Sequence, residues 1–275
     1  PQSGQITATK HMRRLLTGSQ LWQEGEARFL QDPLSFRCAP QVQGASYNVL
    51  EWVWQNWEVE MNTVQDNPVL DTDEDILVSH GNMDSSLLTI GLDSLRAALA
   101  NSIDISAQRI HKLHWPAFSG LPSGLTDTDS PLGGVQFLNL SHIAEAYAAR
   151  VRAYAKPAML NYQGQLADGV EDHATMLPLS VMQTEKLIES AWVVHGIELM
   201  VASWAIHRRG LRKKDLGEGL HRVFEKLAPY LPIGREGDEV FDLQPIVEMA
   251  KNEDFVDLID DEAPPVPEFP DKLKV

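Results

Sequence analysis

Apolar side chains recur along most of this chain at the three- and four-residue spacing of an α-helix. One such segment covers residues 49–61 and closes before Pro68, and a second covers residues 87–103. The second has an apolar stripe broad enough to pack against more than one neighbour. The pattern therefore predicts long helices that lie side by side.

Four further segments have the same periodicity. We expect long helices over residues 136–154, where Pro157 stops or kinks the helix, and from near residue 172 to about 207. Smaller helical pieces are predicted over 216–227 and 243–250. Long helices with wide apolar faces predict an all-α fold, a bundle whose exposed faces need partners.

The connecting segments are of several kinds. An acidic, turn-like loop at 71–75 precedes a predicted short strand at 76–78. Residues 115–134 contain four glycines and three prolines and predict an irregular loop, as does the stretch 162–170. The basic cluster Arg208, Arg209, Arg212, Lys213 and Lys214 is interpreted as a solvated helix end that complements the helix dipole, in preference to an anion site.

Three regions follow from this pattern. Residues 1–207 form the helical bundle with its loops, 208–262 a smaller C-terminal helical region, and 263–275 a Pro-rich mobile tail.

Composition narrows the range of partners. The 275 residues include 39 acidic and 23 basic side chains, a net charge of −16, which argues against nucleic acid and anionic membranes as partners. The only cysteine is Cys38, so no disulfide framework is expected, and no apolar run is long enough to span a bilayer. A cytoplasmic location is the default expectation. His111 and His114 share a helical spacing, but with no third ligand a surface or packing role is predicted and no metal site is expected.

The most specific motif is Q-D-P-L-S-F-R-C-A-P-Q-V-Q-G-A at residues 31–45. It resembles the Q-D-x-x-S-x-R-C-x-P-Q-V-x-G-A block of the aromatic amino acid ammonia-lyases and aminomutases, the histidine and phenylalanine ammonia-lyase family. Four further pieces resemble that family in the same order: E-M-N-T-V-Q-D-N-P at 60–68, H-G-N-M-D at 80–84, S-G-L-P at 119–122 and E-D-H at 171–173. The resemblance covers roughly residues 1–207, and it implies the C-terminal half of such an enzyme.

Three residues are candidates for the catalytic site. The planar guanidinium of Arg37 can bind the carboxylate of an amino acid bidentately, although an ion pair at a helix start is the alternative. Gln31 can hydrogen-bond the same substrate or hold the loop together. Glu171 can stabilise a helix start, but the resemblance implies that it lies in the pocket, where it would pair with an imidazole-like side chain. A histidine-like substrate is therefore expected.

Three departures from the family pattern accompany these residues. Leu34 stands where active members usually carry a tyrosine, and Met83 stands where they carry a phenylalanine; both would contact the substrate. Leucine has no proton to exchange. Arg150 occupies a position that is usually glutamate. Together these departures favour a changed reaction or a catalytically silent chain.

The resemblance also implies a prosthetic group, 4-methylideneimidazol-5-one (MIO), which the family builds from an internal Ala-Ser-Gly. This chain contains no Ala-Ser-Gly, because Ala45-Ser46 is followed by Tyr47 and Ala202-Ser203 by Trp204. MIO is therefore expected on a missing half or on a partner chain. Without that electron sink, this chain alone is not expected to be a lyase.

Two functional hypotheses follow. The first is the C-terminal part of an MIO-type ammonia-lyase, which eliminates ammonia from an aromatic or histidine-like L-amino acid together with an N-terminal half or homologous subunit, in a tetramer-like oligomer. A 2,3-aminomutase is a variant of it. The second is a non-catalytic, lyase-like scaffold or regulatory subunit.

Overall fold

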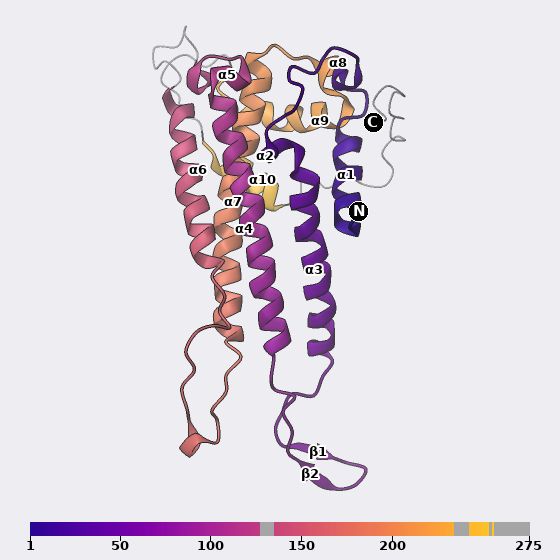
Figure 1. The fold of residues 1–275 in the computed structure, drawn as a ribbon, viewed down its shortest axis with the longest axis vertical. Coiled ribbons are helices and arrows are strands. Elements are labelled where there is room, and N and C mark those ends of the chain that lie inside the picture. The colour runs from indigo at the N-terminus through magenta and orange to yellow at the C-terminus, as the bar shows by residue number, and fades with distance from the viewer. Residues whose placement is uncertain (127–134, 234–241, 253–254, 256–275) are drawn as a thin grey trace.

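Four long helices run side by side in the computed structural model, which describes residues 1–126, 135–233, 242–252 and 255 (Figure 1). They are α3 (Ala39–Met61), α4 (Ser86–His114), α6 (Val135–Tyr154) and α7 (Leu177–Arg208). Helix α4 packs against α3, α6 and α7, as its broad apolar stripe predicts. The predicted all-α bundle is confirmed.

The core lies where α4, α6 and α7 meet. Ile110 of α4, Ala148 of α6 and Ile197 of α7 are fully buried there. Alanines on α6 let its backbone approach its neighbours closely, and Phe137 stacks on Trp204 with ring centroids 5.1 Å apart. None of the described helices combines the length and apolar character that a membrane crossing requires.

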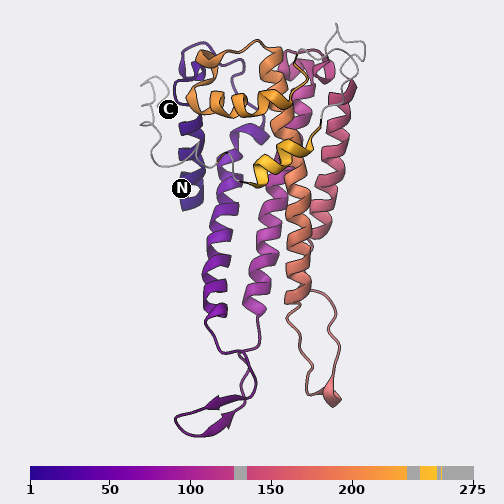
Figure 2. The ribbon, with the colours of Figure 1, turned by 180° about the vertical axis from the view of Figure 1, so that it is seen from behind.

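Shorter helices surround the end of the bundle at which α7 terminates (Figures 1 and 2). They are α1 (Ser3–Leu15), α2 (Leu34–Arg37), α5 (Pro116–Ser119), α8 (Lys213–Leu216), α9 (Glu218–Leu227) and α10 (Gln244–Lys251). Helix α1 crosses α3 at Gly4 and Gly44, where a Cβ on Gly4 would lie 2.2 Å from the Gly44 carbonyl oxygen. Glycine is required at that crossing because no side chain fits between the two backbones.

At the opposite end, two loops extend beyond the helices (Figure 1). The first contains an antiparallel hairpin of β1 (Val69–Asp71) and β2 (Ile76–Val78), so the predicted strand at 76–78 is confirmed. Its acidic turn is closed by Asp71, whose Oδ1 accepts hydrogen bonds from the backbone N–H groups of Asp73 and Glu74. The second loop covers residues 155–176 and joins α6 to α7.

The start of α7 differs from its prediction, because the helix begins at Leu177 and not near residue 172. Met176 has a left-handed backbone with φ of 55°, and Leu166 pairs with Glu171 in an isolated β-bridge that keeps this stretch non-helical. Helices α9 and α10 lie close to where they were predicted. The irregular segment predicted over 115–134 includes the four-residue helix α5. Residues 127–134 of this segment and the predicted tail 263–275 lie outside the described part of the chain.

Candidate functional site

The segment that carries Gln31, Leu34 and Arg37 lies where α2 leads into α3 (Figure 1). Pro33 precedes the four-residue helix α2 and Pro40 occupies the first turn of the long helix α3, so a proline restricts the backbone where each helix begins. Gln31 and Arg37 are exposed, and Leu34 is 61% exposed. All three side chains are therefore available to a ligand or a partner.

Buried contacts on the other side of this segment fix its position. The ring of Phe36 packs on Phe118 of α5 with centroids 5.1 Å apart. The buried Ser35 offers its carbonyl oxygen to Arg109 Nη1 at 3.0 Å, and Arg109 also forms an ion pair with Glu198 of α7. Arg109 thus connects α4, α7 and the segment that carries Arg37.

The charge state of Glu198 follows from this contact. Burial by itself would raise the pKa of Glu198, but His195 and the Arg109 guanidinium outweigh it and lower the pKa to about 2. The carboxylate is therefore ionised across the physiological range, and the ion pair with Arg109 persists.

The basic cluster at the end of α7 is only partly solvated. Arg212 is exposed beside Asp215, as predicted, but Arg208 donates to the Thr126 carbonyl oxygen at 3.2 Å, and Arg209 donates to that of Ser119. Burial and the nearby charge of Arg28 lower the pKa of Arg209. The solvated-end interpretation is thus wrong for the half-buried Arg208, whereas Arg209 stays exposed, and both arginines hold the segment 119–126 against the end of α7.

Met83 and Glu171 lie in the two loops at the other end of the bundle (Figure 1). Met83 is 45% exposed and Glu171 is exposed. An ion pair of 2.7 Å between His173 Nε2 and Asp84 Oδ2 joins the two loops. Hydrogen bonds from Ser86 and then His173 lower the pKa of Asp84. The structure thus brings together the segments that carry Met83 and Glu171.

The two groups of candidate residues do not converge within one chain. Gln31, Leu34 and Arg37 precede α3, and Met83 follows it, near the end of the first loop. The 23 residues of α3 span about 34 Å at the rise of an α-helix. One chain therefore presents two half-sites at opposite ends of the bundle.

Beside the loop end, an open groove of about 890 Å³ runs between α3, α4 and the start of α7. Trp54, Trp57, Met61, Leu88 and Leu177 are among the residues that line it. The groove is mainly apolar, and Trp54 is 56% exposed. These tryptophans are thus on the surface of the single chain.

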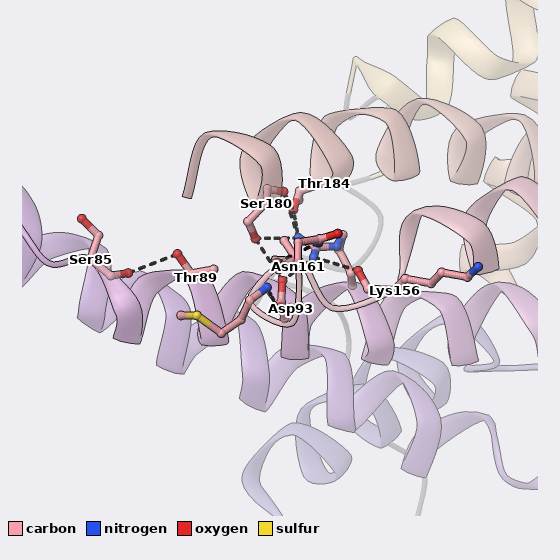
Figure 3. Close-up of polar contacts among 10 residues, drawn as sticks. Ser85, Thr89, Asp93, Lys156, Asn161, Ser180 and Thr184 are labelled. Atoms are coloured by element: carbon pink, nitrogen blue, oxygen red, sulfur yellow. Dashed lines mark hydrogen bonds and ion pairs between the residues drawn. The ribbon is translucent and has the colours of Figure 1, made fainter. Parts of the chain in front are cut away.

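Sequence reasoning missed a buried polar network on α4. Arg96 has no exposed surface, and it pairs with Asp93 and donates to Ser180 of α7. Figure 3 shows Asp93 on α4 and Ser180 on α7. The available signal was an Asp and an Arg three residues apart within the apolar stripe at 87–103, a position where a charge needs a partner.

Two other predictions concern polar residues of the bundle. His111 is partly exposed and its Nε2 lies 2.9 Å from Glu145, whereas His114 is buried against Ser141, which agrees with the predicted surface or packing role. Burial and then the charge of His111 lower the pKa of His114 to about 4. In the described residues no group of three or more His, Cys, Asp and Glu side chains is placed to hold a metal ion. Arg150 is exposed and its guanidinium lies 5.0 Å from the ring centroid of Tyr147, so its charge is outside the core.

Comparison with known proteins identifies the class to which this fold and these motifs belong. The family model of aromatic amino acid lyases matches residues 1–229. The chain is a member of the aromatic amino acid lyase family.

Particular relatives are histidine ammonia-lyases. That of Symbiobacterium thermophilum is 31% identical over 268 residues, which cover 96% of this chain and 51% of the relative. That of Geobacillus kaustophilus is 34% identical over 76% of this chain and 41% of its own length. This chain spans about half the length of the curated relatives that it matches.

Solved structures agree with this assignment. Ergothionase from Treponema denticola, an ergothioneine-degrading enzyme, aligns with a TM-score of 0.82 and 32% identity over 93% of this chain and 50% of its own. Histidine ammonia-lyase from Trypanosoma cruzi aligns with a TM-score of 0.81 and 27% identity over 100% of this chain and 53% of its own. Tyrosine aminomutase from Streptomyces globisporus, at 22% identity and a TM-score of 0.82, shares the fold.

Proposed function

We propose that this chain supplies the C-terminal half of an ammonia-lyase for histidine or a histidine-like amino acid. The observation that carries the proposal is the family match, with histidine ammonia-lyases as relatives over nearly the whole chain. The remaining half, with the electron sink, is supplied by another polypeptide segment or subunit.

In this proposal each candidate residue has a defined task. Arg37 binds the substrate carboxylate through two parallel N–H···O bonds, and Gln31 hydrogen-bonds the same end of the substrate. Glu171 attracts the imidazole-like side chain, while Leu34 and Met83 form apolar walls that exclude water. Because Leu34 carries no ionisable proton, the base that removes the β-proton comes from the other half.

MIO, which supplies an electron sink in this family, does not fit on this chain. Ala45-Ser46-Tyr47 lies inside α3 and Ala202-Ser203-Trp204 inside α7, where helical hydrogen bonds hold the backbone and a glycine is missing. Neither segment can cyclise without unfolding its helix. We therefore assign the group to the other half.

The separation of the two half-sites supports an oligomeric active site. An antiparallel neighbour would bring Arg37 of one copy beside Met83 and Glu171 of another, which one chain cannot do. The exposed apolar groove along α3 and α4 supplies a surface for such a neighbour. A tetramer-like assembly and a cytoplasmic location remain parts of this proposal.

Native mass spectrometry of the protein from its own source tests the proposal, together with an absorbance scan for MIO and an assay of ammonia release from histidine. We expect a complex with a polypeptide that has lost two waters, and release of ammonia. A homo-oligomer of this chain with no dehydrated partner and no turnover would overturn the proposal and leave the non-catalytic scaffold.

A second candidate substrate is ergothioneine, because ergothionase is among the relatives that align over nearly the whole chain, at 32% identity. The same assay with ergothioneine in place of histidine separates the two. Accumulation of a β-amino acid would instead indicate the 2,3-aminomutase variant.

A further inference from the structure

The buried network around Arg96 connects three segments that are far apart in the sequence. The Nη1 atom of Arg96 donates to the Ser180 carbonyl oxygen at 2.8 Å, to Ser180 Oγ at 2.7 Å and to Thr184 Oγ1 at 3.0 Å. Its Nη2 pairs with Asp93 and donates to the Lys156 carbonyl oxygen at 3.4 Å. Figure 3 shows the side chains of Ser180 and Thr184 on α7 directed toward Asp93 on α4.

Asp93 uses both of its carboxylate oxygens. Oδ1 accepts from Arg96 and from Ser180 Oγ at 3.2 Å, while Oδ2 accepts from the backbone N–H of Met159 at 3.1 Å. Lys156 and Met159 stand just after α6, and Ser180 stands in the first turn of α7. The pair therefore holds both stems of the loop 155–176, the loop that carries Glu171.

Stability alone is a weak reason for this arrangement. A buried ion pair is costly to desolvate, and apolar side chains of similar volume often stabilise a core as well or better. Apolar side chains, however, cannot fix backbone groups of a loop in one geometry, as a guanidinium and a carboxylate do through directed hydrogen bonds.

We propose that Asp93 and Arg96 are positioning residues, which fix the loop 155–176 so that Glu171 faces the substrate. The loop-fixing part stands on the contacts above, and the effect on substrate rests on the proposed function. Neither residue contacts the substrate in this proposal.

The chain offers a matched control on the same helix. Arg109 and Glu198 also join α4 to α7 through a mostly buried ion pair, but Arg109 holds the Ser35 carbonyl oxygen and so the segment 31–38. Disturbing either pair removes a similar interaction, but each change should loosen a different half-site.

Hydrogen exchange of the complete assembled protein tests the loop-fixing part. The amide of D93N has one acceptor oxygen where the carboxylate has two. Either Arg96 and Ser180 Oγ or the backbone N–H of Met159 therefore loses its acceptor. We expect amide exchange in 157–176 to accelerate at least tenfold, with 31–38 within twofold of the parent. The control E198Q should give the reverse pattern. Equal acceleration of both segments by D93N, or no acceleration in 157–176, would overturn the proposal.

A milder pair of variants covers the case in which D93N does not fold. T184V keeps the shape of the side chain but loses the hydroxyl that accepts from Arg96, whereas T184S retains it. We expect about threefold faster exchange in 157–176 for T184V and parent-like exchange for T184S. Identical behaviour of the two variants would count against a role of the hydrogen bond.

Kinetics with histidine then test the link to Glu171. We expect D93N to raise KM about tenfold with a smaller change in kcat, because a displaced Glu171 weakens substrate binding while the MIO absorbance is unchanged. An altered exchange pattern with parent-like KM would refute the link to Glu171 and retain the loop-fixing part. Absence of turnover in the parent protein would refute the proposed function alone, and exchange would still decide whether Asp93 fixes the loop.

Discussion

The two ends of the bundle hold their candidate residues in different ways. At the α2 end, the segment 31–38 is short, contains Pro33 and is followed by Pro40. It packs on Phe118, and Arg109 donates a hydrogen bond to its Ser35 carbonyl oxygen. At the loop end, the candidate residues stand on long loops, where Tyr162 is 92% and Val170 82% exposed. The first half-site is therefore preorganised by its own packing, whereas the second is held by hydrogen bonds at the loop stems, by the bridge between Leu166 and Glu171 and by the ion pair between His173 and Asp84.

Under the proposed function, this difference indicates where the partner would bind. Exposed apolar side chains on both loops, Leu77 and Leu160 among them, have no covering element in the part of the chain that the structure describes. Patches of this kind mark interaction sites. A partner that covers the loop end would complete both its packing and its half of the site.

The largest effect on stability is expected where backbones touch, at the crossing of α1 and α3 beside the α2 end. In G44A the new Cβ would lie 2.4 Å from the backbone nitrogen of Gln5, so the helices must separate. We expect a loss of about 3 kcal/mol in the free energy of unfolding, measured by urea denaturation.

The matched control lies at the loop end. Gly81 has no atom within 4 Å of a Cβ position, so G81A should change stability by less than about 0.5 kcal/mol. Equal losses in G44A and G81A would contradict the view that the two ends differ in their packing.

Acid should weaken the α2 end through Glu198. Its folded-state pKa of about 2 lies below its ordinary value of 4.5, so the ionised group stabilises the fold above pH 4.5. That contribution, about 3 kcal/mol, should be lost as the pH falls from about 4.5 to about 2. Unfolding measured across this range should show a smaller pH dependence in E198Q, and parallel curves for the two proteins would contradict the assignment.

The sequence was sufficient to predict that the long helices exist, because their apolar periodicity is long and regular. The resemblance to the lyase family, which rests on short contiguous blocks, also made Arg37 and Glu171 candidates, and their roles stay predictions. The start of α7 was misplaced because Met176 adopts a left-handed conformation, which is usually indicated in a sequence by a glycine or an asparagine.

The arrangement of the site could not be predicted for a different reason. Periodicity gives the length of α3 but not that the two half-sites stand at its opposite ends, which needs the topology of the bundle. The contacts of Arg96 with Ser180 and of Arg109 with Ser35 join residues more than seventy positions apart. A single sequence carries no signal for such pairs.

Loss of the Arg37 charge should impair the reaction with little effect on folding. Under the proposed function R37M removes the bidentate partner of the substrate carboxylate, and we then expect kcat/KM for histidine to fall about 100-fold, which corresponds to about 2.7 kcal/mol. The exposed Arg150 provides the control, because R150M removes an equal charge away from the core and should retain kcat/KM within twofold. Similar losses in both variants would indicate a general effect of charge.

The smallest effect on global stability is expected for the ion pair that joins the two loops. His173 and Asp84 are 55% and 39% exposed, so solvent screens their attraction and H173A should cost less than about 0.5 kcal/mol in unfolding. Exchange should nevertheless accelerate locally in residues 79–85 and 170–176, because this pair links the Met83 loop to the Glu171 loop. K251A removes a comparable surface pair with Glu248 on α10 and should leave both loops unchanged. A loss above about 1 kcal/mol in H173A would mean that the loop end is integrated into the folded core as firmly as the α2 end.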